Sequence, residues 1–144
     1  MNSPKRILVV ANETVGGTAL IDAVKRHADS GPVQVHVICP QNQPKHGYVI
    51  YAGTVREAAE NRLALTLAQL REVGVEADGE VGDRDPVAAV RDALRGRQVD
   101  EVVVSTLPPG ISRWLGQDIP SKLRHNVTVP VAVVYEGAAA GARA

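Results

Sequence analysis

The sequence predicts a single doubly wound α/β domain, in which helices cover both faces of a five-stranded parallel sheet. Three observations predict this fold class. Five short apolar segments alternate along the chain with four segments of helical periodicity, as expected when crossover helices connect parallel strands. The segments Ile7–Ala11 and Val102–Val104 are unbroken apolar runs, typical of strands buried on both faces. Aromatic residues make up 3% of the chain and Phe is absent, so Val, Ile, Leu and Ala must build the core.

The first elements follow from periodicity and turn residues. The run Ile7–Ala11 predicts a strand, and apolar residues after it recur at helical spacing until Gly31–Pro32 ends the helix. Alternation of Val with polar residues predicts a second strand over Val33–Pro40. The segment Pro40–Gly53 is rich in Pro, Gly and Tyr, and we interpret it as a surface loop.

A long helix and an edge strand are predicted next. Thr54 and Glu57 form a capping box, and an apolar stripe continues from there until Gly74 ends the helix. Three acidic residues then alternate with small or apolar ones over Val75–Val81. This pattern predicts an edge strand with one wet, acidic face that discourages further strand pairing.

The remaining elements complete the alternation. Asp85 and Pro86 are a favourable N-cap and first-turn pair for a helix that ends at Gly96. We then expect a strand ending at Ser105–Thr106, a helical region over residues 112–125 complicated by Gly116 and Pro120, and a last strand over Val131–Tyr135. The domain is expected to span residues 1–136, and residues 137–144 to form a flexible tail.

Composition and charge exclude several classes of function. The chain has 144 residues and a formal net charge of zero, so it suits one domain without the basic excess that nucleic acids or anionic membranes favour. One cysteine excludes internal disulfides, and the four histidines show no metal-ligand spacing. With no signal-peptide pattern and no run of about 20 apolar residues, we expect a cytoplasmic protein without metal, membrane or nucleic-acid partners.

Binding residues are expected at the carboxyl ends of the strands, where the winding of an open parallel sheet reverses. If the first strand is central, the turns that begin at Asn12 and Ser105 meet there. Neither turn carries a P-loop or a dinucleotide-binding glycine motif. Residues 13–18 have hydroxyls and glycines before a helix, so they either bind a phosphate through free backbone N–H groups or only start the helix.

Catalytic interpretations find little support in the sequence. Cys39 ends a strand before a proline, where a lone cysteine is typically a buried small side chain and not a nucleophile. Asp83 follows the third strand, as the phospho-acceptor of a receiver domain would. The acidic pair and the lysine that receiver chemistry needs are missing, so we predict no catalytic residue.

The segment Ser105–Gln117, S-T-L-P-P-G-I-S-R-W-L-G-Q, is the most informative stretch. Its hydroxyls, the start of a helix and Arg113 together suit the binding of a small anion. Alternatively, the two prolines only shape a loop, Ser112 caps a helix and Arg113 is solvated. Three basic residues against one acid between Thr106 and His125 favour a small anionic ligand over a polyanion.

The order and spacing of several motifs resemble the universal stress protein family over residues 5 to 135. They are R-I-L-V-V-A-N-E-T in the opening strand, the long helix from Thr54, G-D-R-D-P-V-A-A-V from Gly82, V-D-E-V-V-V-S-T from Val99, and L-R-H shortly before P-V-A-V-V. The resemblance implies an adenine-nucleotide α-hydrolase-like fold with strand order 3-2-1-4-5. It also implies a non-catalytic role in the stress response and a homodimer joined through the last strand, where Val131, Val133 and Tyr135 offer an apolar edge.

One branch of that family binds ATP through a fingerprint after the fourth strand: G-x-x-G, nine residues, then G followed by Ser, Thr or Asn. Here the corresponding turn begins S-T-L-P-P-G and lacks both early glycines. Side chains and proline rings keep backbone N–H groups away from phosphate, so tight ATP binding is not expected. By this resemblance, the remaining pocket is lined by Asn12, Thr14, Ser105, Thr106, Gly110, Ser112, Arg113 and Gly116.

Three hypotheses for function follow. The first is a non-catalytic, dimeric stress-response protein that requires no cofactor and senses a weakly bound adenine nucleotide or small anion. The second is an ATP- or AMP-binding protein with a remodelled phosphate loop and slow hydrolysis. The third is a flavodoxin-like cofactor carrier, which a yellow purified protein would favour.

Overall fold

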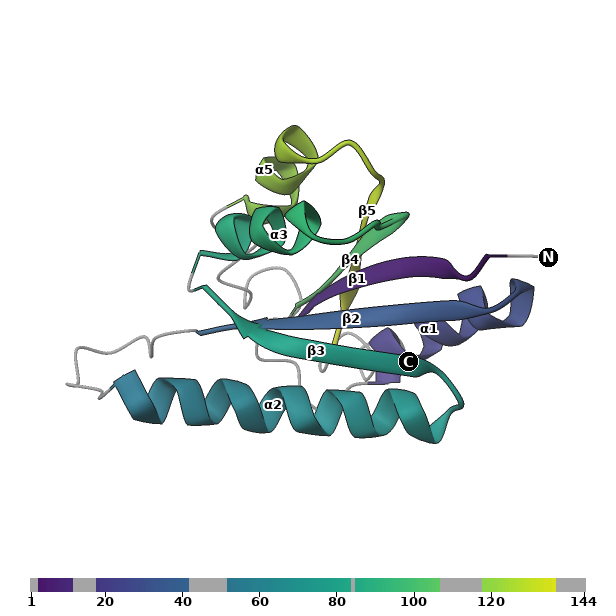
Figure 1. The fold of residues 1–144 in the computed structure, drawn as a ribbon, viewed down its shortest axis with the longest axis horizontal. Coiled ribbons are helices and arrows are strands. Elements are labelled where there is room, and N and C mark those ends of the chain that lie inside the picture. Colours follow the sequence, from purple (N-terminus) through teal and green to yellow (C-terminus); the bar gives the residue numbers. More distant parts are fainter. Residues whose placement is uncertain (1–2, 12–17, 42–51, 84, 107–117, 137–144) are drawn as a thin grey trace, which may run out of the picture.

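The structure, a computed structural model, describes residues 3–11, 18–41, 52–83, 85–106 and 118–136. One sheet has the strand order β3-β2-β1-β4-β5, and every neighbouring pair is parallel. Its strands are β1 (Lys5–Ala11), β2 (Val33–Pro40), β3 (Glu76–Gly82), β4 (Glu101–Thr106) and β5 (Val131–Tyr135). The sheet lies between two layers of helices (Figure 1): α1 (Thr18–Ser30) and α2 (Ala52–Glu72) on one face, α3 (Pro86–Arg95) and α5 (Ile119–Asn126) on the other. The predicted fold and strand order are confirmed.

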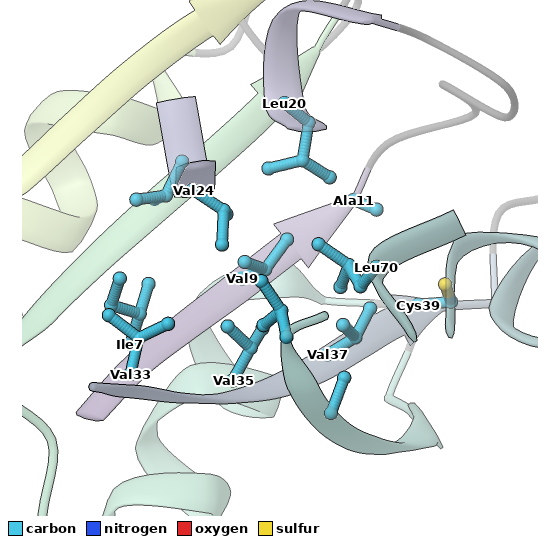
Figure 2. Close-up of a cluster of buried hydrophobic side chains, with 13 residues drawn as sticks. Ile7, Val9, Ala11, Leu20, Val24, Val33, Val35, Val37, Cys39 and Leu70 are labelled. Carbon is cyan, nitrogen blue, oxygen red and sulfur yellow. The ribbon is translucent and has the colours of Figure 1, made fainter. Parts of the chain in front are cut away.

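Aliphatic side chains fill the space between the sheet and each helix layer. Figure 2 shows the cluster on the α1 and α2 face, where Val9 and Val37 of the central strands lie close to Leu20 and Val24 of α1 and Leu70 of α2. A second cluster on the opposite face joins β1 and β4 to α3 and α5. Both faces of the central strands are therefore buried, which is why their sequences are continuous apolar runs.

The acidic strand β3 forms one edge of the sheet, as predicted. Its side chains at Glu76, Asp78 and Glu80 are exposed and share one face. The alternation in β2 places His36 toward the same polar face, yet this side chain is buried. Its Nδ1 lies 2.8 Å from Asp78 Oδ1 and its Nε2 lies 2.8 Å from Glu80 Oε2. Each ring nitrogen therefore lies within hydrogen-bond distance of one carboxylate of β3, and these contacts link β2 to the edge strand.

One predicted helix boundary is wrong. The long helix begins at Ala52, so Thr54 is its third residue and not its N-cap. The predicted helical region over residues 112–125 is described only from residue 118 onward, where α5 begins at Ile119 and Pro120 lies in its first turn. A proline is well tolerated at that position because the first N–H groups of a helix have no intrahelical acceptor. The predicted surface loop over residues 40–53 and the tail over 137–144 fall mostly or wholly outside the described residues.

The start of α3 confirms the predicted N-cap. Asp85 has extended backbone angles, and its carboxylate accepts a hydrogen bond of 3.0 Å from the backbone N–H of Val87. We expect Asp85→Ala to lower the free energy of unfolding by about 1 kcal/mol, because that N–H loses its acceptor. Chemical denaturation measures this change. Asp92→Ala removes an exposed carboxylate that pairs with Arg95 on the same helix, and its effect should stay below about 0.5 kcal/mol. Equal losses in the two variants would argue against the cap.

Cys39 at the carboxyl end of β2 is completely buried, as predicted for a small core side chain. Burial raises the pKa of its thiol to about 11, and the positive charge of Arg62 offsets only part of that rise. The thiol is therefore protonated at neutral pH. Because the thiolate is the nucleophilic form, Cys39 has the properties of a packing residue.

Candidate functional site

The candidate site lies at the carboxyl ends of β1 and β4, where the strand order reverses. From β1 the chain builds β2 and β3 on one side, then crosses to β4 and β5 on the other. Ala11, the last residue of β1, is paired in register with Ser105 of β4. The two predicted turns therefore start side by side, at the place where open parallel sheets bind ligands.

Two of the eight predicted site residues fall within the described structure. Ser105 and Thr106 end β4, and both side chains are fully buried. Each of the two residues takes part in an interaction within the protein. The other six, which lie outside the described residues, are Asn12, Thr14, Gly110, Ser112, Arg113 and Gly116.

Glu136 is a residue of this edge that the sequence interpretation missed. It directly follows β5, and its side chain is 4% exposed. Its Oε1 accepts a hydrogen bond of 2.9 Å from the backbone N–H of Ala19, and its Oε2 accepts one of 2.9 Å from Leu20. Its own backbone N–H donates to the carbonyl oxygen of Thr106 at 2.9 Å. One carboxylate therefore joins the first turn of α1 to the ends of β4 and β5.

This contact occupies part of the start of α1, whereas residues 13–17, to which the phosphate interpretation also applies, lie outside the described residues. The first N–H groups of a helix have no intrahelical acceptor and attract anions. Those of Ala19 and Leu20 are occupied by Glu136, so they are not free to bind a phosphate. The only local signal for Glu136 was its position after a strand that ends at this edge, the same signal that singled out Asn12 and Ser105.

A positive charge lies at the same edge, at the end of β2. Arg62 extends from α2, and its Nη2 donates a hydrogen bond of 3.1 Å to the carbonyl oxygen of Pro40. Its Nε is buried and has no hydrogen-bond partner among the described residues. The described part of this edge therefore carries both an anion and a cation, and Arg113 of the adjoining turn lies outside the described residues.

A cavity of about 450 Å³ lies at the opposite, amino end of the sheet. Arg6, Gln34 and Asp78 line it on the sheet, and Arg97 closes one side after α3. Ligands of open parallel sheets bind at the other end, so we do not assign the site to this cavity.

The model of the universal stress protein family matches residues 4–135. This chain belongs to the universal stress protein family. A comparison with curated proteins finds no match.

Solved structures of this family share the fold. The universal stress protein from Archaeoglobus fulgidus in complex with dAMP is 16% identical, with a TM-score of 0.64 and 90% of this chain and 97% of that chain covered. A family protein from Arabidopsis thaliana with AMP bound is 12% identical, with a TM-score of 0.64 and 95% of each chain covered. A universal stress protein in complex with cAMP is 17% identical, with a TM-score of 0.53 and coverage of 94% and 100%. Family membership favours the first two hypotheses over a flavodoxin-like carrier.

In the described part of this universal stress protein, His, Cys, Asp and Glu form no group of three or more that is able to hold a metal ion. Each ring nitrogen of His36 lies next to a different carboxylate, so the three side chains do not converge on one point at which a metal ion would be held. None of the described helices is long and apolar enough to span a membrane.

Proposed function

We propose that this universal stress protein is a non-catalytic, cytoplasmic regulatory protein that binds an adenine nucleotide weakly at the carboxyl edge between β1 and β4. The observation that carries the proposal is the position of Ser105 and Thr106. They end β4 beside the end of β1, at the switch point where this class of sheet binds ligands. The AMP, dAMP and cAMP complexes of its structural neighbours support an adenine nucleotide as the ligand.

We expect weak nucleotide binding because few backbone N–H groups at this edge are available to donate hydrogen bonds to phosphate. The turn after Thr106 contains Pro108 and Pro109, which have no N–H to donate. The N–H groups at the start of α1 already bind Glu136. Few backbone donors therefore remain for a triphosphate. Arg113 is the basic side chain of this turn, and we propose that it binds the ligand's phosphate together with Ser112.

Calorimetry with adenosine, AMP, ATP and FMN tests this function. We expect AMP to bind with a Kd between about 10 µM and 1 mM, and no phosphate to be released from ATP.

Arg113→Ala should weaken AMP binding by about 1.5–3 kcal/mol, because charge-assisted hydrogen bonds to phosphate are lost. Arg97→Ala, at the amino end of the sheet, removes the same charge and should leave AMP binding unchanged. Sub-micromolar ATP binding, or no adenine ligand bound at millimolar concentration, would refute the proposal.

The proposed homodimer forms along the free edge of β5. Val131, Val133 and Val134 are only partly buried on this strand, and Tyr135 is 39% exposed. An apolar edge strand with few charges favours pairing with another chain. Sedimentation at micromolar concentration should give about twice the chain mass of 15.3 kDa. Tyr135→Glu should shift the equilibrium toward monomer, whereas Leu65→Glu on the exposed face of α2 should not. A monomer at every concentration would exclude this interface.

A further inference from the structure

The carboxylate of Glu136 is a buried charge that the structure places beside the proposed site. Its side chain is 4% exposed and accepts hydrogen bonds at 2.9 Å from two successive N–H groups of α1. Each of its oxygens has one of these donors. The carboxylate is therefore held by the protein in the manner in which a helix N-terminus binds an external anion.

The backbone of Glu136 fixes where that charge lies relative to the ligand. Its N–H donates to the carbonyl oxygen of Thr106, the last residue of β4 and the neighbour of Ser105. A nucleotide bound at the end of β4 therefore has this carboxylate as a neighbour. In a buried setting, the carboxylate repels each negative charge of the ligand that lies within about 10 Å of it. Each such repulsion lowers the affinity of the protein for the ligand by about tenfold.

We propose that Glu136 determines the specificity of the site, because its carboxylate excludes phosphate groups from the first turn of α1 and so selects adenine ligands of low negative charge. This inference rests on the proposed function for the identity of the ligand. It assigns adenosine and AMP as preferred ligands and ATP as the disfavoured one. The exclusion of phosphate from α1 depends only on the contacts of Glu136 and can be tested without a nucleotide.

The first experiment compares ligand selectivity in two charge-removing variants. Glu136→Gln keeps the size of the side chain and one acceptor oxygen, while Glu72→Gln removes an exposed carboxylate at the far end of α2. We expect Glu136→Gln to raise ATP affinity by about tenfold and to leave adenosine affinity within about twofold. Glu72→Gln should leave both affinities unchanged. A purely structural cap would change the two ligands alike, so an unchanged ratio of ATP to adenosine affinity would overturn the proposal.

The second experiment uses inorganic phosphate as the probe and thermal unfolding as the readout. In Glu136→Ala the N–H groups of Ala19 and Leu20 lose their acceptor. Phosphate should raise the Tm of this variant more than that of the wild type, at sodium chloride-matched ionic strength, because it binds the folded state only. Equal shifts in the two proteins would reject exclusion by Glu136. If no adenine ligand binds the wild type, the proposed function fails, and this phosphate measurement still decides the role of Glu136.

Discussion

Replacing Gly79 by alanine is expected to lower the free energy of unfolding by about 3 kcal/mol. Gly79 lies in β3, where this edge strand packs between β2 and α2. A Cβ atom at this position would lie 2.5 Å from the carbonyl oxygen of Val37 and 2.6 Å from Cδ1 of Leu63. The first contact is with the backbone, so relief requires β3 to move away from β2. Chemical denaturation measures the loss, and hydrogen exchange should show β3 losing protection before β1.

Gly96→Ala is the matched control for this substitution. Gly96 follows α3, and apart from its neighbours in the chain no atom of the described residues lies within 4 Å of a Cβ built on it. Its φ of −112° is accessible to alanine, so the change in stability should stay within about 0.5 kcal/mol. If Gly79→Ala were as stable as Gly96→Ala, the close packing of α2, β3 and β2 described above would be incorrect.

Leu8→Ala should cost about 3 kcal/mol, the second large effect. Leu8 lies in the central strand β1, is fully buried and belongs to the cluster that joins the sheet to α3 and α5. Truncation removes buried apolar surface and leaves a cavity that two packed layers cannot easily close. Leu65→Ala is the matched control, because Leu65 on α2 is 52% exposed, and it should change stability by less than about 0.5 kcal/mol. The denaturation midpoints of the two variants should therefore differ clearly. Similar midpoints would argue against a sheet buried on this face.

Local signals predicted those parts of the fold that local interactions determine. The N-cap pair Asp85–Pro86 marked the start of α3 correctly, because the capping hydrogen bond spans two residues. The alternating acidic residues of β3 correctly indicated an edge strand, because charged carboxylates are well solvated at the edge of a sheet and disfavour pairing with a further strand. The apolar run in β1 marked a central strand, because both its faces meet helices.

Features that depend on distant residues were not predictable in the same way. A Thr-x-x-Glu pair also fits inside a helix, so Thr54 and Glu57 could not fix the first residue of α2. The burial of His36 depends on carboxylates from another strand. The contact of Glu136 with α1 joins residues more than 100 positions apart, between segments with no shared pattern. For the site, the sequence indicated the sheet edge at which β1 and β4 end side by side. That the carboxylate of Glu136 occupies the start of α1 became visible only in the structure.

The most direct test of nucleotide binding at the carboxyl edge is an amide NMR titration of ¹⁵N-labelled protein with AMP. We expect the largest chemical-shift changes in the described residues at Ala11, Ser105 and Thr106, because they end the two strands at the switch point. Half-saturation should occur between about 10 µM and 1 mM AMP. The opposite result is an unchanged spectrum at millimolar AMP, or changes centred on Arg6 and Gln34 at the amino-end cavity. Either outcome would contradict a nucleotide site between β1 and β4.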